Sequence, residues 1–518
     1  MKKVLSILMA VLMVASMFSV VAFAEEVAEE EEVLPVCTYY VGGARGTQTA
    51  LGGSKGKNEA NALAFTCFDL EGRGGNKVIP AINKDVTSGK YSAIEIIVAG
   101  GSTVAVQFEG LVGTAETPII FKAKTGEAVA TPIFESEKVD NVAPAIHVID
   151  CEYVTFEKLG AKSSLYHGVK VEDSSNITFK NMEFTNVGYT DYELPVFEDA
   201  ETGVVEYPQM DTAGLLEKGA ALFIGAGNTD ITADGCSFDK CRAGVLVDST
   251  KPVAAEEVEG EETEEPAAPV VTSGIEILNS KFANINIAGV ILNGADDVLV
   301  SGGKASNVGT LAAAENYDGT PVAVVKVNGS NNVVVEKIFS SYNEALAIFE
   351  NSTGKVRYNV SDGDGACAFG EGVLVYNNTF VNATSIEIAT SYNNIFSMLI
   401  GGKVKVADGD ANCYYWTSKG KGGFKKNPKF ANAFDGMTEG QDPIDNYRLS
   451  TVSACLGAGV KCDDDMGTTD FYGNEIGDTI NVGADMGAGV EATQEFVSDF
   501  VDFFNYIFAV IKNFLGIK

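Results

Sequence analysis

The chain has 518 residues, of which 46% are hydrophobic, and a formal net charge of −34 at pH 7. This acidity argues against a nucleic-acid-binding protein, because the phosphate backbone rewards lysine and arginine. It also disfavours polyanionic ligands unless a cation bridges them. The nine cysteines include no CxxC motif and the chain has only two histidines, which argues against a zinc site.

The N-terminus is typical of a secretory signal peptide over residues 1–24. Two lysines precede a long apolar run, and this run ends in Ala-Phe-Ala, a suitable cleavage site. We therefore expect an extracellular or cell-surface protein. The glutamate-rich segment 25–36 is expected to be a disordered leader. Residues 37–143 mix strand-like and helix-like patterns, and we expect them to form an N-terminal cap and the first coils of a solenoid.

Residues 144–400 carry a repeat of about 23 residues, built from an apolar strand, a polar turn and a second apolar strand. Such a period predicts a solenoid whose coils bury their apolar sides by stacking on one another. Residues such as Val245 and Val247, on either side of each strand centre, would point inward. The central residues of the first strand in successive coils would point outward: His147, Lys170, Phe223, Leu246, Ile291, Lys326 and Ile348.

Two insertions interrupt these coils. Residues 188–217 could form an ordered functional loop, whereas the Pro-, Ala- and Glu-rich residues 250–272 are expected to be disordered. Residues 401–492 are less periodic and are expected to hold the C-terminal coils and a closing segment. Residues 493–518 place polar residues at helical spacing among phenylalanines, which predicts an amphipathic α-helix. This helix would cap the solenoid, lie peripherally on a membrane or cell-wall surface, or join copies into oligomers.

Several later segments resemble those of one protein family. Val356-Arg357-Tyr358-Asn359 followed by Tyr376-Asn377-Asn378-Thr379-Phe380 is similar to two consecutive family coils. Ser391-Tyr392-Asn393-Asn394, Ser453-Ala454-Cys455-Leu456-Gly457 and Gly483-Ala484-Asp485-Met486-Gly487 are similar to its terminal coils and closing segment. Over roughly residues 37–492 the chain resembles the secreted right-handed parallel β-helix repeat proteins, which are related in fold to pectate lyases.

The resemblance implies an all-β, right-handed parallel β-helix with an N-terminal cap, followed by the predicted C-terminal helix. It also implies export and interaction with a polysaccharide or a cell-envelope glycan. The family includes polysaccharide lyases, glycoside hydrolases, epimerases and proteins without known activity, so the resemblance leaves open whether this chain is an enzyme. Neutral glycans, or acidic glycans together with Ca²⁺, suit the charge of the chain.

A polysaccharide lyase needs a base and a positive group that neutralises the uronate carboxylate. Lys355 and Arg357 are the candidates for base and clamp. Ca²⁺ is the one cofactor that we expect, with Asp362, Asp364 and Glu371 as its oxygen ligands. The Asp-Gly pairs at residues 362–365 and 408–410 are equally the composition of simple polar turns, so both interpretations stay open.

Three alternatives accompany the lyase hypothesis. A β-helix glycosidase would use close carboxylates, for which Asp230 and the pair Asp296-Asp297 are the candidates. A non-catalytic surface or adhesion protein would attach through its C-terminal helix. The apolar members of the outward column indicate either a covered face, under residues 188–217 or the C-terminal helix, or a hydrophobic sugar-binding platform.

Two further patterns have mainly structural interpretations. Asn181, Asn279 and Asn377 recur at similar turn positions, which predicts a ladder of hydrogen-bonded side chains.

Most cysteines are expected to be small buried hydrophobic residues. Any disulfide would involve the only close pairs, which are Cys236 with Cys241 and Cys455 with Cys462.

Overall fold

The structure is a computed structural model. It describes residues 34–42, 56–57, 62–71, 74–102, 105–124, 133–136, 143–163, 166–188, 197–198, 205–206, 219–250, 270–313, 317–398, 402–431 and 443–491. The predicted signal peptide, most of both insertions and the predicted C-terminal helix at 493–518 lie outside the described residues, and those expectations stay predictions. No helix in the described part of the chain is long and apolar enough to cross a membrane.

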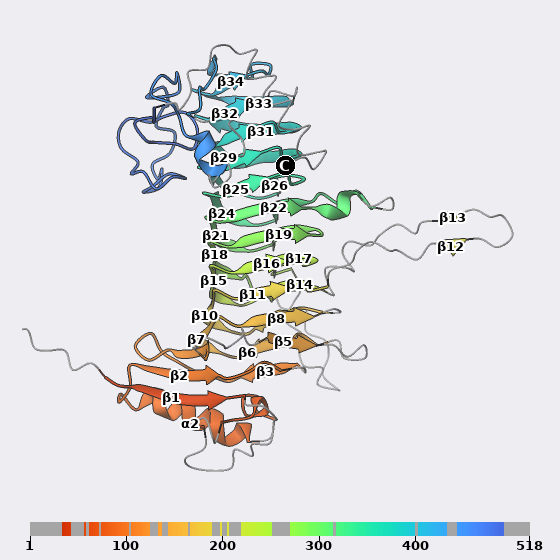
Figure 1. The fold of residues 1–518 in the computed structure, drawn as a ribbon, viewed down its shortest axis with the longest axis vertical. Coiled ribbons are helices and arrows are strands. Elements are labelled where there is room, and N and C mark those ends of the chain that lie inside the picture. Colours follow the sequence, from red (N-terminus) through yellow and green to blue (C-terminus); the bar gives the residue numbers. More distant parts are fainter. Residues whose placement is uncertain are drawn as a thin grey trace, which may run out of the picture.

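Stacked parallel strands form an elongated coil with three faces (Figure 1). The first face consists of β3 (Val106–Glu109), β6 (Ile146–Ile149), β9 (Val169–Glu172), β14 (Ala220–Ile224), β17 (Ala243–Asp248), β20 (Ala288–Asn293), β23 (Ala323–Asn328) and β26 (Ala347–Glu350). The second face consists of β1 (Val36–Val41), β2 (Ala93–Val98), β4 (Ile119–Ala123), β7 (Glu152–Glu157), β10 (Ser175–Lys180), β15 (Thr229–Asp234), β18 (Ser273–Leu278), β21 (Asp296–Ser301), β24 (Asn331–Glu336) and β27 (Gly354–Arg357).

The third face has shorter strands. It consists of β5 (Ile133–Ser136), β8 (Gly160–Ser163), β11 (Glu183–Thr185), β16 (Ser237–Asp239), β19 (Lys281–Ile285), β22 (Lys304–Val308), β25 (Phe339–Ser341), β28 (Val360–Asp362), β30 (Thr379–Val381), β32 (Ile395–Ser397), β34 (Cys413–Tyr415) and β35 (Phe424–Lys425). The first two faces merge at β29 (Ala366–Tyr376), which pairs with both β26 and β27. Beyond it, β31 (Ser385–Tyr392) and β33 (Lys403–Asp410) complete the merged face.

The register confirms the outward column expected from the repeat. His147 pairs with Lys170 and Lys170 with Phe223, and the column continues through Leu246 and Ile291 to Lys326 and Ile348. The flanking residues Val245 and Val247 are fully buried, as the alternation of strand side chains requires. The all-β parallel β-helix predicted from the sequence is therefore confirmed.

Aromatic rings stack inside the coil from one turn to the next. On the third face Phe184, Phe238 and Phe282 lie nearly parallel, with ring centroids 4.8 and 4.9 Å apart. This distance matches the spacing between neighbouring strands, so each ring packs directly on the ring of the previous coil inside the core. Eight of the nine cysteines are also buried, and all nine are free thiols. The cysteines therefore serve as small core residues, and neither close pair is bridged.

Part of the first face is covered, as its apolar outward residues indicate. Leu246 and Ile291 are only 3% and 2% exposed. They pack in one cluster with Leu311 and Val322, which come from the short helix η3 (Thr310–Ala313) and the residues that follow it. The described cover thus arises from the connection between β22 and β23. The two covers named from the sequence lie outside the described residues.

The N-terminal end is closed by helix α2 (Gly75–Thr87), which lies below β1 in Figure 1. Its apolar side chains Ile79, Ile82 and Val86 are buried in the same core as the first strands. An open solenoid end would expose that core, which is why a capping element is needed there. Next to the last coils, residues 443–491 form irregular loops that begin with the short helix η4 (Pro443–Tyr447). These loops lie beside β29 and β32 (Figure 1).

Candidate functional site

An open groove of about 710 Å³ runs along the outer side of the second face. It reaches from β7 to β27, which spans six strand spacings or about 29 Å at 4.7–4.9 Å each. One column of outward residues forms its floor, and each member pairs with the next in register: Thr155, Thr178, Thr232, Glu276, Leu299 and Val334. The groove is therefore long and shallow, with a polar floor from Thr155 to Glu276 and an apolar floor at Leu299 and Val334.

A second column lines the edge of this groove where each strand begins. Its members adopt left-handed backbone conformations with φ between 50° and 68°, which asparagine, aspartate and glycine tolerate best: Tyr153, Asn176, Asp230, Gly274, Asp297 and Asn332. The turn geometry explains why polar residues recur here. It also places their side chains along one line beside the floor of the groove.

Two aspartates lie on either side of a glycine in this column. Gly274 lies in register between Asp230 and Asp297, because β18 pairs with β15 on one side and with β21 on the other. A side-chain carbon at Gly274 would lie 2.5 Å from Asp230 Oδ1, so the Asp230 carboxylate extends over the glycine. The two aspartates are two strand spacings apart, about 9.5 Å along the coil axis. Asn332 Nδ2 donates a 2.6 Å hydrogen bond to Asp297 Oδ1 and orients this second carboxylate.

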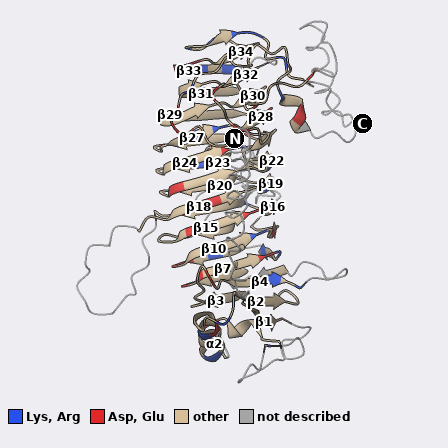
Figure 2. Ribbon diagram, turned by 90° about the vertical axis from the view of Figure 1, so that its left-hand side faces the viewer, with Lys and Arg blue, Asp and Glu red and all other residues tan. Residues whose placement is uncertain are grey.

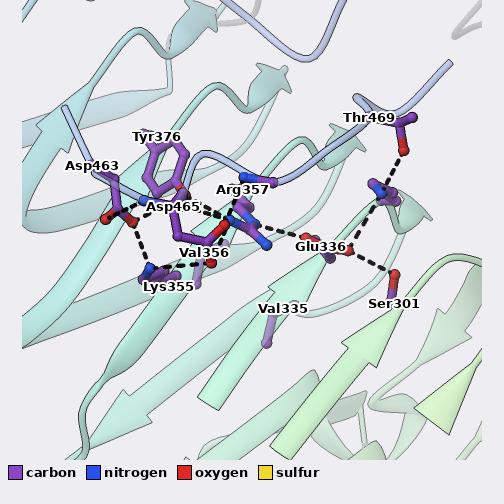
Figure 3. Close-up of polar contacts among 12 residues, drawn as sticks. Ser301, Val335, Glu336, Lys355, Val356, Arg357, Tyr376, Asp463, Asp465 and Thr469 are labelled. Atoms are coloured by element: carbon purple, nitrogen blue, oxygen red, sulfur yellow. Dashed lines mark hydrogen bonds and ion pairs between the residues drawn. The ribbon is translucent and has the colours of Figure 1, made fainter. Parts of the chain in front are cut away.

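At the C-terminal end of the groove, Arg357 forms a buried ion pair with Glu336. Arg357 Nε lies 2.7 Å from Glu336 Oε2, and each side chain is 9% exposed. Arg357 Nη1 also donates to the Tyr376 hydroxyl at 3.0 Å and to the Asp465 carbonyl at 2.8 Å (Figure 3). Burial lowers the pKa of Arg357, but Tyr376 and Glu336 outweigh it and the pKa is raised. Arg357 is thus a permanently charged residue that links the coil to the closing loops through its Nε and Nη1 atoms.

The structure places Lys355 next to Arg357, as their spacing on one strand requires. Lys355 Nζ forms an ion pair with Asp463 Oδ2 at 2.7 Å and lies 3.7 Å from Asp465 Oδ2. Both aspartates come from the irregular loops that follow the coils (Figure 3). Burial would raise the pKa of Asp463, yet the hydrogen bond from Lys355 leaves it lowered. The predicted base and clamp are therefore together, but carboxylates of the closing loops hold them.

The three predicted calcium ligands lie outside the groove and have different surroundings. Asp362 is on the third face, where it accepts a hydrogen bond from the Tyr447 hydroxyl. Asp364 is fully buried and accepts 2.6 Å hydrogen bonds from the hydroxyls of Ser340 and Ser361. Glu371 is exposed on β29. In the part of the chain that the structure describes, no three His, Cys, Asp or Glu residues are grouped so that they could hold a metal ion, so these three do not form such a group.

The other carboxylate and amide patterns also have defined places. In the alternative Asp-Gly turn, Asp408 pairs with Lys421 at 2.7 Å. Of the predicted asparagine ladder, Asn279 donates to Asp234, whereas Asn377 bonds to the closing loops. A second ladder of fully buried asparagines was missed from the sequence: Asn359, Asn378, Asn394 and Asn412. The sequence could have predicted this second ladder, because an asparagine lies two residues after the second-face strand in each of these coils.

The three faces, the inward stacking and the polar groove define a parallel β-helix protein. No protein-family model matches the chain, and no curated protein matches it. Solved structures with similar chain courses include the pectate lyase Pel9A, with 13% identity, TM-score 0.47 and coverage of 88% of this chain and 97% of the other. They also include the GH136 lacto-N-biosidase of Eubacterium ramulus, with 14% identity, TM-score 0.40 and coverage of 74% and 67%. For PfbA, a surface adhesin of Streptococcus pneumoniae, the identity is 12%, the TM-score 0.35 and the coverage 67% and 87%.

Proposed function

We propose that this protein binds an extended glycan along the groove of the second face. The observation that carries the proposal is the groove itself, whose floor is a column of in-register side chains across six stacked strands, polar from Thr155 to Glu276 and apolar at Leu299 and Val334. A glycan chain presents a hydroxyl-rich surface at a regular repeat, and a column of hydroxyls, amides and carboxylates at strand spacing can bond to it repeatedly.

The charge of the lining favours a neutral glycan. Asp230, Glu276, Asp297 and Glu336 line the groove, and its one cationic lining residue, Arg357, is already paired with Glu336. An acidic glycan would meet these carboxylates unless a cation bridged them. We therefore expect neutral polysaccharides to bind better than uronate-containing ones in the absence of divalent cations.

A filling substitution in the floor tests the groove. Thr232 is half-buried on the second face, and in Thr232→Tyr a bulky ring would occupy the path of the glycan. The matched control is Ser306→Tyr, which places the same ring at an exposed position of the third face. Calorimetric titration with the neutral glycan selected from a binding screen should show affinity lost in Thr232→Tyr and retained in Ser306→Tyr. Equal affinity for both variants would refute binding in this groove.

Hydrolysis is a second candidate, favoured by the spacing of Asp230 and Asp297. Inverting glycosidases place their two carboxyl groups about 6.5–9.5 Å apart, so that one donates a proton to the glycosidic oxygen while the other activates a water molecule. Two strand spacings put Asp230 and Asp297 close to this range. Asp230→Asn and Asp297→Asn keep the shape and suit the left-handed backbone. Each should abolish release of reducing ends while glycan binding persists; cleavage that survives both substitutions would exclude this pair.

The calcium-assisted lyase stays a prediction that the same glycan screen can test. Elimination from a uronate would require Lys355 to exchange Asp463 for the substrate. Ultraviolet absorbance of unsaturated uronate that depends on Ca²⁺ would support this activity. If calorimetric Ca²⁺ titration gives the same result for the wild type and for Asp362→Ala/Asp364→Ala, these two residues are not metal ligands.

Export and surface attachment remain proposals that rest on the sequence. A non-catalytic surface protein would use the same groove to hold a cell-envelope glycan, with residues 493–518 as its anchor. Deleting 493–518 should then release the protein from the cell fraction into the medium. Identical fractionation of the truncated and full-length chains would leave the anchor without support.

A further inference from the structure

A second concave surface lies at the C-terminal end of the coil, away from the groove of the second face. It encloses about 900 Å³ and is built from β33, β34, β35 and the loops between them. Three lysines and three aromatic residues make up more than half of its lining: Lys403, Lys425, Lys426, Tyr414, Tyr415 and Trp416. In the part of the chain that the structure describes, its lysines include cations without an ion-pair partner, which the groove lacks.

Trp416 is the only tryptophan of the chain and stands out in this surface. Its side chain is 42% exposed, although large apolar residues are usually buried. Its backbone is left-handed, with φ of 55°. Earlier positions in the same column of the third face have the same conformation, and these include Asn307, Tyr342 and Asn382. Asparagine tolerates this conformation far better than tryptophan does, so the turn does not explain why an indole is there.

The surroundings of Trp416 give it a fixed position. Its ring meets that of Tyr415 edge to face, with centroids 5.6 Å apart. The Tyr415 hydroxyl accepts a 3.2 Å hydrogen bond from Asn427 Nδ2. A rigid, exposed aromatic face next to amide and hydroxyl groups is suited to stacking against one side of a ring-shaped ligand.

The local charge opposes that of the whole chain. Residues 402–431 contain seven lysines and two aspartates, within a protein of net charge −34. Lys405 and Lys421 are paired with Glu387 and Asp408. Among the described residues, Lys403, Lys425 and Lys426 have no ion-pair partner, and all three are exposed. Lysine is coloured blue on the strands at this end of the coil in Figure 2.

We propose that this surface binds a carboxylated polysaccharide, with the ring of one sugar stacked on Trp416 and uronate groups paired with Lys403, Lys425 and Lys426. The ammonium groups supply the attraction for the carboxylates. The indole supplies a flat apolar face for the carbon-bound hydrogens of the sugar. This surface is separate from the groove of the second face. The proposal made for it therefore does not depend on whether a glycan binds in the groove.

A role in preventing the last strands from pairing with another chain would explain the lysines but not Trp416. Lysines at the end of a sheet discourage pairing with another chain, and β33 and β35 lie at that end. An exposed tryptophan has the opposite effect, because exposed apolar surface favours association. The combination of indole and free ammonium groups therefore indicates ligand binding.

The single tryptophan makes this site directly measurable, because the intrinsic tryptophan fluorescence of the full chain reports on Trp416 alone. Titration with galacturonate oligomers should change the fluorescence, and raising the salt concentration to about 1 M should abolish the change. The matched neutral probe is the same oligomer after reduction of its carboxylates, and it should bind at least tenfold more weakly.

Two variants separate this site from the groove. Lys425→Ala/Lys426→Ala alters exposed side chains only and should weaken galacturonate binding about tenfold, corresponding to about 1.4 kcal/mol. Thr232→Tyr in the groove should leave the fluorescence titration unchanged. The proposal is overturned if the neutral oligomer binds equally well, if the lysine variant binds like the wild type, or if single-stranded DNA binds more tightly than the uronate oligomer.

Discussion

Arg357 shows how one side chain joins the coil, the groove and the closing loops. Its guanidinium bonds to Glu336 within the sheet and to the Asp465 carbonyl outside it. In Arg357→Leu the buried Glu336 carboxylate would lose its closest partner and keep only Lys337 at 3.5 Å and the Ser301 hydroxyl at 3.0 Å, which should cost about 1.5–3 kcal/mol. Chemical unfolding should therefore show a midpoint below that of the wild type. The double variant Glu336→Gln/Arg357→Leu removes the buried carboxylate charge and should recover part of the loss; no recovery would mean that the ion pair is not the cause.

Asp362 gives a pH dependence with a definite sign. Burial raises the pKa of this carboxyl from 3.8 to about 6, with the Tyr447 hydrogen bond acting against it and Asp364 adding to it. The folded protein thus binds this proton more tightly than the unfolded chain does. The resulting stabilisation is complete below pH 3.8 and is lost as the pH rises through 6, a change of about 3 kcal/mol at 1.36 kcal/mol per pKa unit.

Asp362→Asn should remove this dependence. Between pH 4.5 and 7 the free energy of unfolding should decline less in the variant than in the wild type, because the amide cannot ionise. Asp364 stays in place in both proteins, and because burial is the main cause of its raised pKa, most of its contribution cancels in the comparison. Parallel stability curves for the two proteins over this range would contradict the assignment.

At the scale of strands and turns, the buried asparagine ladder holds successive coils in register. Asn378 Nδ2 donates to Asn394 Oδ1 at 3.0 Å, and Asn378 Oδ1 accepts from Asn359 Nδ2 at 2.9 Å. Asn378→Ala leaves buried partners unsatisfied and should cost about 2–4 kcal/mol in thermal or chemical unfolding. The control is Asn331→Ala, which loses an exposed 3.0 Å bond to Asp296 and should change stability by less than about 0.5 kcal/mol. Similar losses in both variants would contradict the role of burial.

The coil itself was predictable because its signal is local and repeated. Strand alternation and a step near 23 residues were enough to align His147, Lys170 and Phe223 in one column. The contacts of the closing loops were not predictable in this way. Arg357 and Asp465 are 108 residues apart, and no period connects them. Asp364 was misleading for another reason, since a buried carboxylate bonded to two serine hydroxyls has the same sequence signature as an exposed turn.

The groove was partly visible in the sequence. Asp230 and Asp297 were candidates for a carboxylate pair, but the long insertion between them hid that they share one column. Gly274 lies between them in the column. A glycine at this turn position leaves space beside the Asp230 side chain, and this could have indicated that the two aspartates share one column. A register derived from the second face would have placed all three together.

Over the whole molecule, two surfaces of opposite charge lie on different parts of one rod. The groove is lined by four carboxylates and one arginine, whereas the C-terminal end carries three lysines without an ion-pair partner in the described part of the chain. Such a separation suits a protein that contacts neutral and acidic glycans at different places.

The most direct test is a crystal structure of the protein soaked with the neutral oligosaccharide that binds best. Electron density for the sugar should follow the second face between Thr155 and Glu336, with hydroxyl groups near Asp230 and Asp297. Density confined to another face, with the groove occupied only by solvent, would contradict the account.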